Sequence, residues 1–314
     1  MSGVITIAAP LYAIILTGFL AGRRGLMSEA NAGALNRFVF LFAMPAAVFR
    51  FAATNPPPSG ETAFYALTYL ACALSVMAGA YFVGRKLLSL TKREAGVHAF
   101  GSTLGNAVFL GIPIALSVPG WGGPFLILIL MEGIFIMSVG AILMTAPEDG
   151  AKRSFTEQAL GSAQRVSRNP IAMGMIAGFI LSALGASLPE PVERFALFLG
   201  GAAGPAALFS LGVVLAQKRD APAAGGLQSV LAITALKLCL LPLLVIGAMH
   251  LIGASWAQIG AAALFTSVPM GVGVYVQAAH YGIYQRRIAL ALTATTILSM
   301  LTVSTVLLIF APSG

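Results

Sequence analysis

Two short stretches place glycine, proline and hydrogen-bonding side chains inside long apolar segments of the chain. Residues 105–113 read GNAVFLGIP and residues 266–274 read TSVPMGVGV. Within a membrane, backbone groups freed by glycine and proline are tolerated only where they face protein or water. An interruption at each stretch would start a new half-helix after Pro113 and after Pro269, with proline at the favoured first position. The free amide groups and the positive dipole end of each half-helix would suit an anion.

Side chains beside these interruptions would add hydrogen bonds to a bound anion. Asn106, Thr266 and Ser267 would supply them next to the helix starts. A simpler alternative is that both stretches are kinks, because glycine and proline are frequent in membrane helices. We favour interruptions, because two segments in corresponding positions carry the same signal. The predicted substrate-binding residues are Asn106, Gly111, Pro113, Thr266, Ser267, Pro269 and Gly271.

Two ionisable residues, Glu132 and Lys237, lie well inside apolar segments. Each is about ten residues from the nearer end, which at 1.5 Å per residue is roughly 15 Å deep in a core of about 30 Å. An isolated charge there costs at least a few kcal/mol, so we expect both to face the protein interior, near each other or near the interruptions. In a functional interpretation, Glu132 responds to a proton or cation and Lys237 lies near the anion. Alternatively, they form a structural pair that joins two helices.

The composition identifies the elements that must position these residues. Of the 314 residues, 58% are hydrophobic and only 9% are charged, which is too little charge to cover the surface of a soluble domain. The sequence therefore predicts an all-α integral membrane protein. A spanning helix needs roughly 20 apolar residues, and ten segments meet this length. They cover residues 4–22, 32–52, 62–84, 95–118, 122–144, 170–187, 191–216, 227–252, 256–280 and 286–311.

Basic residues alternate between the two sides of the predicted membrane. Most of the 18 lysines and arginines lie in the loops that follow the odd-numbered segments. The positive-inside rule therefore places these loops in the cytoplasm and both termini outside, and we expect a bacterial cytoplasmic (inner) membrane. The net charge of +8 is spread over five short loops instead of one patch, so no nucleic-acid partner is expected.

The longest loop divides the chain into two units of five segments. Residues 145–169 form this predicted cytoplasmic linker, between a first unit of residues 1–144 and a second of residues 170–314. An odd number of spans per unit makes the units enter the membrane from opposite sides, as in inverted repeats. PAAVF at residues 45–49 and PAALF at residues 205–209 occupy corresponding positions, and so do the two interrupted stretches.

Four longer stretches resemble the auxin efflux carrier family, which includes plant PIN-type carriers and bacterial malonate-type permeases. They are ALNRFVFLFAMPAAVFR, LGNAVFLGIPIAL, SVPMGVGVYVQAAHYG and ALTATTILSMLTVSTVLLI, and the resemblance runs over essentially the whole chain. Asn106 and Pro113 match the first helix crossover of the family, and Pro269 and Gly271 match the second. Plant relatives also carry a large hydrophilic central loop. Here the corresponding loop has only about 25 residues, so regulation through it is not implied.

The resemblance implies a fold and a mechanism. The fold has ten helices in a 5+5 inverted repeat, with the fourth and ninth helices broken and crossing, as in bile-acid symporters and cation/proton antiporters. Spans one, two, six and seven would form a scaffold, and the remaining spans a transport bundle. Family members move organic anions by an elevator-like displacement of that bundle and often form homodimers through the scaffold.

Enzymatic function is not supported by the sequence. An intramembrane aspartyl protease needs two membrane aspartates, but Asp149 and Asp220 both fall in predicted loops. A rhomboid-type Gly-x-Ser-Gly motif and a GxxxxGK[ST] phosphate loop are both absent from the sequence. His98, His250 and His280 have no metal-ligand spacing, so we expect neither a metal nor a cofactor.

Three transport functions remain, and we predict the first. It is a secondary transporter that moves a small organic anion, a carboxylate, by alternating access. A passive channel is the second, although interrupted inverted helices are typical of alternating access. The third is a sodium- or proton-coupled symporter or antiporter of the bile-acid-symporter or cation/proton-antiporter type. Glu132 is the one carboxylate available for that coupling.

Overall fold

The computed structural model describes residues 2–54, 60–144, 170–216 and 226–311. The predicted linker at 145–169 and the loop at 217–225 lie outside these residues. The described chain is helical apart from short connections and one isolated β-bridge. The α-helices are α1 Ser2–Arg23, α2 Glu29–Phe38, α3 Met44–Thr54, α4 Gly60–Lys86, α5 Lys92–Gly101, α6 Ile112–Ser117, α7 Gly122–Met131, α8 Met137–Met144, α10 Pro170–Ala183, α11 Glu190–Gly201, α12 Ala203–Ala216, α13 Gly226–Ala235, α14 Leu241–Leu251, α15 Trp256–Ser267, α16 Val272–His280 and α17 Gln285–Phe310. Four π-helical turns are η1 Val39–Ala43, η2 Ala107–Gly111, η3 Glu132–Ile136 and η4 Leu236–Leu240.

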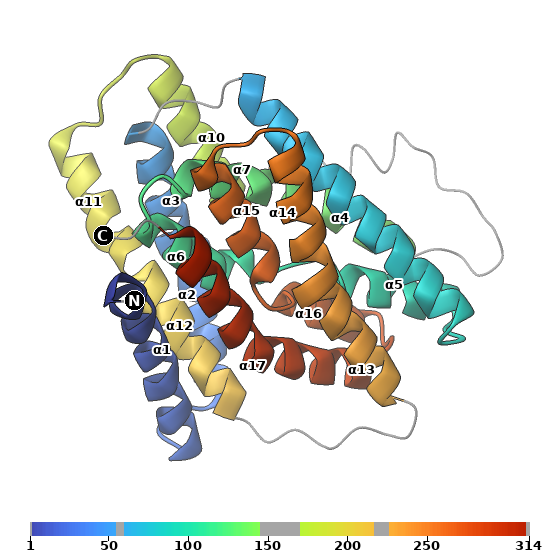
Figure 1. Cartoon of the computed structure of the whole chain (residues 1–314). Helices are drawn as coiled ribbons and strands as arrows, with labels where there is room; N and C mark the ends of the chain where they lie inside the picture. The colour runs from blue at the N-terminus through green and yellow to red at the C-terminus, as the bar shows by residue number, and fades with distance from the viewer. Residues whose placement is uncertain (1, 55–59, 145–169, 217–225, 312–314) are drawn as a thin grey trace.

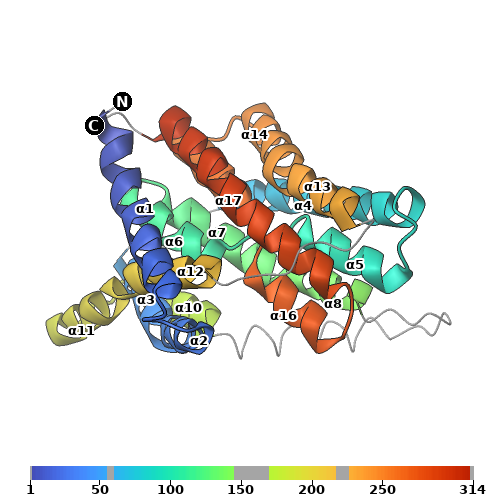
Figure 2. The ribbon, with the colours of Figure 1, turned by 90° about the horizontal axis from the view of Figure 1, so that it is seen from below.

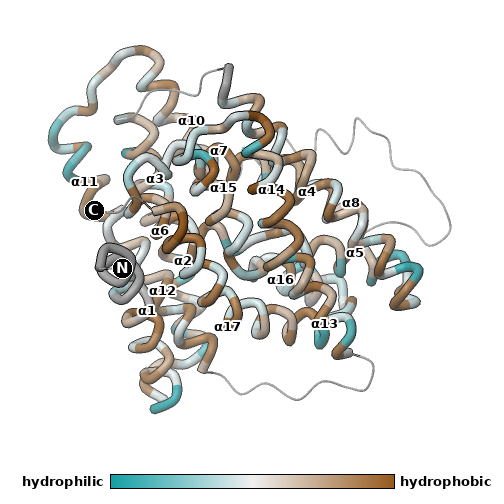
Figure 3. Tube along the Cα trace, viewed as in Figure 1, coloured by the Kyte–Doolittle hydropathy of each residue, from teal (hydrophilic) through white to brown (hydrophobic). Residues whose placement is uncertain are grey.

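Several of these helices suit a membrane. Within the described ranges, six are long and apolar enough to cross one: Glu29–Thr54, Thr62–Lys86, Gly122–Met144, Glu190–Ala216, Gly226–Leu251 and Gln285–Phe310. Apolar residues cover most of their length (Figure 3). The predicted segments 95–118 and 256–280 are instead each made of two shorter helical pieces. The chain is therefore an all-helical integral membrane protein with several candidate spans.

Three of the four π-helical turns end two residues before a proline. Proline has no amide hydrogen to donate, and its ring clashes with the carbonyl four residues earlier. A wider turn, in which the preceding residue bonds five residues back, lets the helix continue past the proline. The prolines are Pro45, Pro113 and Pro242, and the longer bonds run from the amides of Met44, Ile112 and Leu241 to the carbonyls of Val39, Ala107 and Leu236. η3 has no such proline, and its first residue is Glu132.

The helices form two groups that lie side by side (Figures 1 and 2). The first group contains α1, α2–η1–α3, α10 and α11–α12, with α1 packed on α12 and α10 packed on α3. The second group contains α4 to α8 and α13 to α17, together with η2, η3 and η4. The α6 and η2 segments of the second group contact α12 of the first.

Glycine permits the close packing within the first group. A Cβ atom at Gly212 of α12 would lie 2.0 Å from the carbonyl oxygen of Ile15 in α1. At Gly178 of α10, a Cβ would lie 2.5 Å from the carbonyl oxygen of Phe49 in α3. Membrane helices gain little from hydrophobic burial against lipid, so small residues that allow backbones to approach are a main source of their packing energy.

Replacing Gly212 with alanine is expected to loosen the first group. The added methyl group meets a backbone carbonyl, and overpacking of this kind costs about 1–3 kcal/mol. Scanning fluorimetry of the detergent-solubilised protein should therefore show a lower apparent melting temperature. Gly247→Ala in α14 is the matched control, because nothing lies within 4 Å of a Cβ built there and alanine favours the helix. Equal melting temperatures for the two variants would contradict the close packing of α1 on α12.

Candidate functional site

The interrupted segments cross and bond to each other. α5 ends at Gly101 and α15 ends at Ser267, and the residues that follow each are extended or turned until the next helical residue. An isolated antiparallel bridge pairs Gly105 with Met270. The Asn106 amide donates to the Pro269 carbonyl at 2.8 Å. In the opposite direction, the amide of Gly271 donates to the carbonyl of Leu104 at 3.0 Å. Each interruption thus satisfies some of the backbone groups that the other leaves free.

The interruptions predicted from the sequence are present, but the predicted starts of the new helices were wrong. The first new helical piece begins at Ala107, and Pro113 lies inside it, in the first turn of α6. The second begins at Val272, and Pro269 lies in the extended stretch before it. The helix does not start at Pro113 because the η2 turn accommodates this proline without ending the helix.

Glu132 and Lys237 both reach this crossing. Glu132 is only 6% exposed, and its Oε2 atom accepts hydrogen bonds from the Tyr69 hydroxyl at 3.1 Å and from the Gly105 amide at 3.4 Å. Lys237 is 1% exposed, and its Nζ atom donates to the Thr266 carbonyl at 2.9 Å. Both side chains approach Gly105, although the ion pairs found among the described residues do not include the two of them.

Each of these charges faces backbone groups of the opposite polarity. Thr266 is in the last turn of α15, where the free carbonyls carry partial negative charge, so the Lys237 ammonium stabilises that helix end. The Glu132 carboxylate accepts from an amide in the first interruption, two residues before the helical piece that starts at Ala107. The two side chains therefore hold the two interruptions, one from α7–η3 and one from α13–η4.

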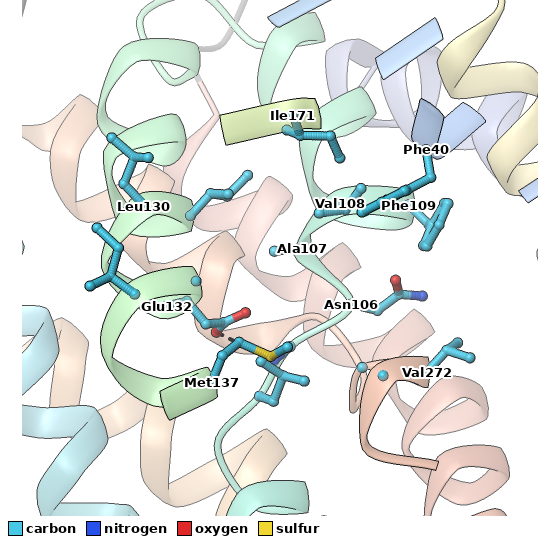
Figure 4. Close-up of a pocket in the computed structure, with 17 residues that line it drawn as sticks. Phe40, Asn106, Ala107, Val108, Phe109, Leu130, Glu132, Met137, Ile171 and Val272 are labelled. Carbon is cyan, nitrogen blue, oxygen red and sulfur yellow. Dashed lines mark hydrogen bonds between the residues drawn. The ribbon is translucent and has the colours of Figure 1, made fainter. Parts of the chain in front are cut away.

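A cavity of about 400 Å³ opens beside the crossing, between the two groups of helices. η1 and α10 contribute one wall, and the crossing with α7, η3 and α8 contributes the rest. Figure 4 shows Asn106 between Phe109 and Val272, and Glu132 beside Met137. The lining residues are Phe40, Leu104, Gly105, Asn106, Ala107, Val108, Phe109, Ile129, Leu130, Glu132, Gly133, Ile134, Met137, Ile171, Gly271, Val272 and Gly273.

Several polar groups on this lining have no hydrogen-bond partner among the residues that the structure describes. The Asn106 side chain is 4% exposed, and none of the described residues forms a hydrogen bond with its side-chain amide group. The second carboxylate oxygen of Glu132 is likewise without a partner within the described structure. The first amides of a helix have no intrahelical acceptor. Here these are the amides of residues 107–109 and 272–273, which precede the first intrahelical bonds, made by the amides of Leu110 and Val274. Hydrogen-bond donors therefore gather where the two helices start.

The remaining predicted site residues lie next to the crossing but off the cavity wall. Gly111 is buried against the ring of Phe125, where a Cβ would come within 2.4 Å of it. The Thr266 hydroxyl donates to carbonyls of its own helix, and the Ser267 carbonyl accepts from the Thr302 hydroxyl at 2.8 Å. Of the nine predicted residues, the structure brings Asn106, Gly271 and Glu132 together on the cavity.

Sequence reasoning missed polar residues that bond at the crossing, among them Thr295 of α17, whose hydroxyl accepts from the Met270 amide at 3.3 Å, and Tyr69 of α4. Tyr69 is fully buried and donates to Glu132. A tyrosine inside a long apolar segment was the available signal, because a buried phenol hydroxyl usually finds a hydrogen-bond partner. Phe40 and Ile171, which close the cavity from the first group, are ordinary apolar residues and carried no such signal. In the described ranges, His, Cys, Asp and Glu side chains form no group of three that could hold a metal ion.

Comparison with known proteins finds membrane transporters. A family model described as "Membrane transport protein" matches residues 4–307. A protein of Rhizobium meliloti (strain 1021) named "Putative malonate transporter" is 30% identical over 311 residues, which are 97% of this chain and 95% of that protein. An uncharacterized transporter of Escherichia coli (strain K12) is 26% identical over 66% of this chain and 67% of its own length. An uncharacterized transporter of Methanocaldococcus jannaschii is 32% identical over 35% of this chain and 36% of its own length.

A match of this extent, on a helical membrane fold with two crossing interrupted helices, makes the chain a membrane transporter and not an enzyme. The chain belongs to the membrane transport protein family, the auxin efflux carrier family that its sequence resembles.

Proposed function

We propose that this transporter is a secondary carrier of a small organic anion, a carboxylate, and that the crossing is its binding site. The observation that carries the proposal is the set of unbonded amides at two helix starts, which line one cavity with the Asn106 side chain. Helix starts attract anions through their free amides and dipoles. The relative named for malonate supports a carboxylate. In the proposed site, Asn106, Gly271 and the helix starts contact the anion, while Gly111, Pro113, Thr266, Ser267 and Pro269 shape the crossing.

The proposed architecture is a 5+5 inverted repeat of ten spans, with units 1–144 and 170–314 joined by a linker at 145–169. Reciprocal packing supports it. In the first group, the first predicted span (α1) packs on the seventh (α12), and the sixth (α10) packs on the second (α3). In the proposed repeat, span one corresponds to span six and span two to span seven, so each of these two packed pairs is the counterpart of the other. The two interrupted segments are counterparts in the same way, and they bond to each other in both directions.

The proposed mechanism is an elevator-type alternation in which the second group of helices moves along the first. The cavity supports this division, because Phe40 and Ile171 line it from the first group and every other lining residue belongs to the second. The first group would be the scaffold, and exposed apolar side chains on α11, Phe195 at 65% and Phe198 at 78%, suit a homodimer contact or lipid. The positive-inside pattern supports a bacterial inner membrane with both termini outside.

A coupled symporter or antiporter of the bile-acid-symporter or cation/proton-antiporter type is the second candidate. The observation in its favour is Glu132, a buried carboxylate with one unbonded oxygen at the crossing. Buried ionisable groups of this kind often carry protons or cations through membrane proteins. Electrogenic cation movement without any organic substrate would favour this candidate over the first.

Replacing Asn106 with alanine is expected to weaken anion affinity without unfolding the protein. The loss of one or two hydrogen bonds to a charged ligand corresponds to about 1.5–3 kcal/mol, or roughly 10- to 100-fold in affinity. Solid-supported-membrane currents from proteoliposomes, screened with a panel of organic anions, give the half-saturating concentration for wild type and variant. Saturation and counterflow in the wild type would distinguish a carrier from a channel. Gln228→Ala, which removes an exposed side-chain amide from α13, is the control, and undiminished affinity in Asn106→Ala would contradict the site.

Replacing Glu132 with glutamine is expected to make transport insensitive to an imposed pH gradient, because the side chain can no longer gain or lose a proton. The measurement is anion uptake into proteoliposomes with and without a pH gradient. Glu190→Gln, on the exposed part of α11, should keep the wild-type response. If Glu132→Gln retains normal transport and pH dependence and only lowers the melting temperature, Glu132 is a structural residue of the crossing.

A further inference from the structure

The charges around the cavity limit the kind of anion that it can hold. We infer that the site selects monocarboxylates with an apolar body over dicarboxylates, including malonate. This inference rests on the proposed function and narrows its substrate class. It differs from what the name of the Rhizobium meliloti relative would suggest, and it depends on three features of the described residues: the balance of charge, the position of Lys237 and the character of the walls.

The helix starts at the crossing balance about one negative charge. Each helix start carries the equivalent of roughly half a positive elementary charge, and two of them, at residues 107–109 and 272–273, line the cavity. Glu132 and Lys237 carry opposite charges when ionised, and both approach Gly105. Lys237 offsets the Glu132 charge only in part, because Glu132 lines the cavity and Lys237 does not. The two helix starts therefore supply about one positive charge in all, which suits one carboxylate.

No cationic side chain is placed to receive a second carboxylate. Lysine, arginine and histidine are missing from the lining of this cavity. Lys237 lies behind the first interruption, with its Nζ atom 3.4 Å from where a Cβ of Gly105 would stand and bonded to the Thr266 carbonyl. The ionisable group that does line the cavity is Glu132, whose free oxygen would repel another carboxylate. A second carboxylate would therefore be buried with neither a cationic side chain nor a helix start to balance it, which is strongly disfavoured.

The walls of the cavity suit an apolar body. Phe40, Phe109, Leu130, Ile134, Met137 and Ile171 form most of the surface away from the helix starts. The volume of about 400 Å³ lies within the range of small-molecule sites and exceeds what malonate fills. Each methylene group buried against such walls improves affinity by about fourfold. An amphipathic monocarboxylate therefore gains affinity from the helix starts through its carboxylate and from the apolar walls through its body.

The test compares matched acids that differ by one carboxylate. 3-Phenylpropionate and phenylsuccinate share a phenyl group and a carbon chain, and malonate has two carboxylates without an apolar body. Isothermal titration of the purified protein in detergent is expected to show 3-phenylpropionate binding at least tenfold more tightly than either diacid. Glu132→Gln should narrow the ratio between 3-phenylpropionate and phenylsuccinate, because the repelling charge is gone. Glu190→Gln should leave that ratio unchanged, and the melting temperature of each unliganded variant verifies its fold.

The outcomes separate this inference from the proposed function. Equal or tighter binding of malonate or phenylsuccinate to the wild-type protein overturns the inference and leaves a carboxylate carrier in place. The uncharged 3-phenylpropionamide tests whether the crossing binds anions at all. If it binds as tightly as the acid, or if none of the acids binds, the crossing is not an anion site, and both proposals fail.

Discussion

The structure depends on one constraint, that backbone amides and carbonyls removed from water must be bonded. A continuous membrane helix meets this constraint within itself, whereas an interrupted helix does not. Here two interruptions meet, and each supplies acceptors for donors of the other, through the bonds between Asn106 and Pro269 and between Gly271 and Leu104. The residues at the two helix starts, whose amides have no acceptor among the described residues, line a cavity. The two interruptions thus leave free hydrogen-bond donors beside a cavity, as the proposed anion site requires.

The buried charges have a place in the same arrangement. Lys237 stabilises the carbonyl end of α15, and Glu132 accepts from an amide of the first interruption. Tyr69 supports Glu132 from a third helix. Each charge therefore compensates part of a helix dipole or a freed backbone group. This role goes beyond forming an ion pair with the other charge. Because the same residues fix the crossing and line the cavity, a change of protonation at Glu132 would alter the bonds of Gly105, which lines the proposed binding site.

Much of the fold could be predicted from the sequence because it depends on local properties. Apolar length and the positions of glycine and proline identified the helical segments and the two that are interrupted. The exact starts of the new helices were not predictable from proline alone, since η2 carries the chain past Pro113 while Pro269 lies in an extended stretch. Tyr69, Phe40 and Ile171 come from distant parts of the chain, and their positions depend on packing between helices. The burial of Glu132 and Lys237 followed from the cost of charge in a membrane, but their separate hydrogen bonds depend on the crossing geometry.

The most direct test of this mechanism is a structure determined in lipid nanodiscs with a bound monocarboxylate at saturating concentration. The carboxylate is expected within hydrogen-bond distance of the amides at residues 107–109 and of the Asn106 side chain, with its apolar body toward Phe40 and Ile171. Helices that run without interruption through residues 102–106 or 268–271 would contradict the mechanism. An anion bound away from both helix starts would contradict it as well.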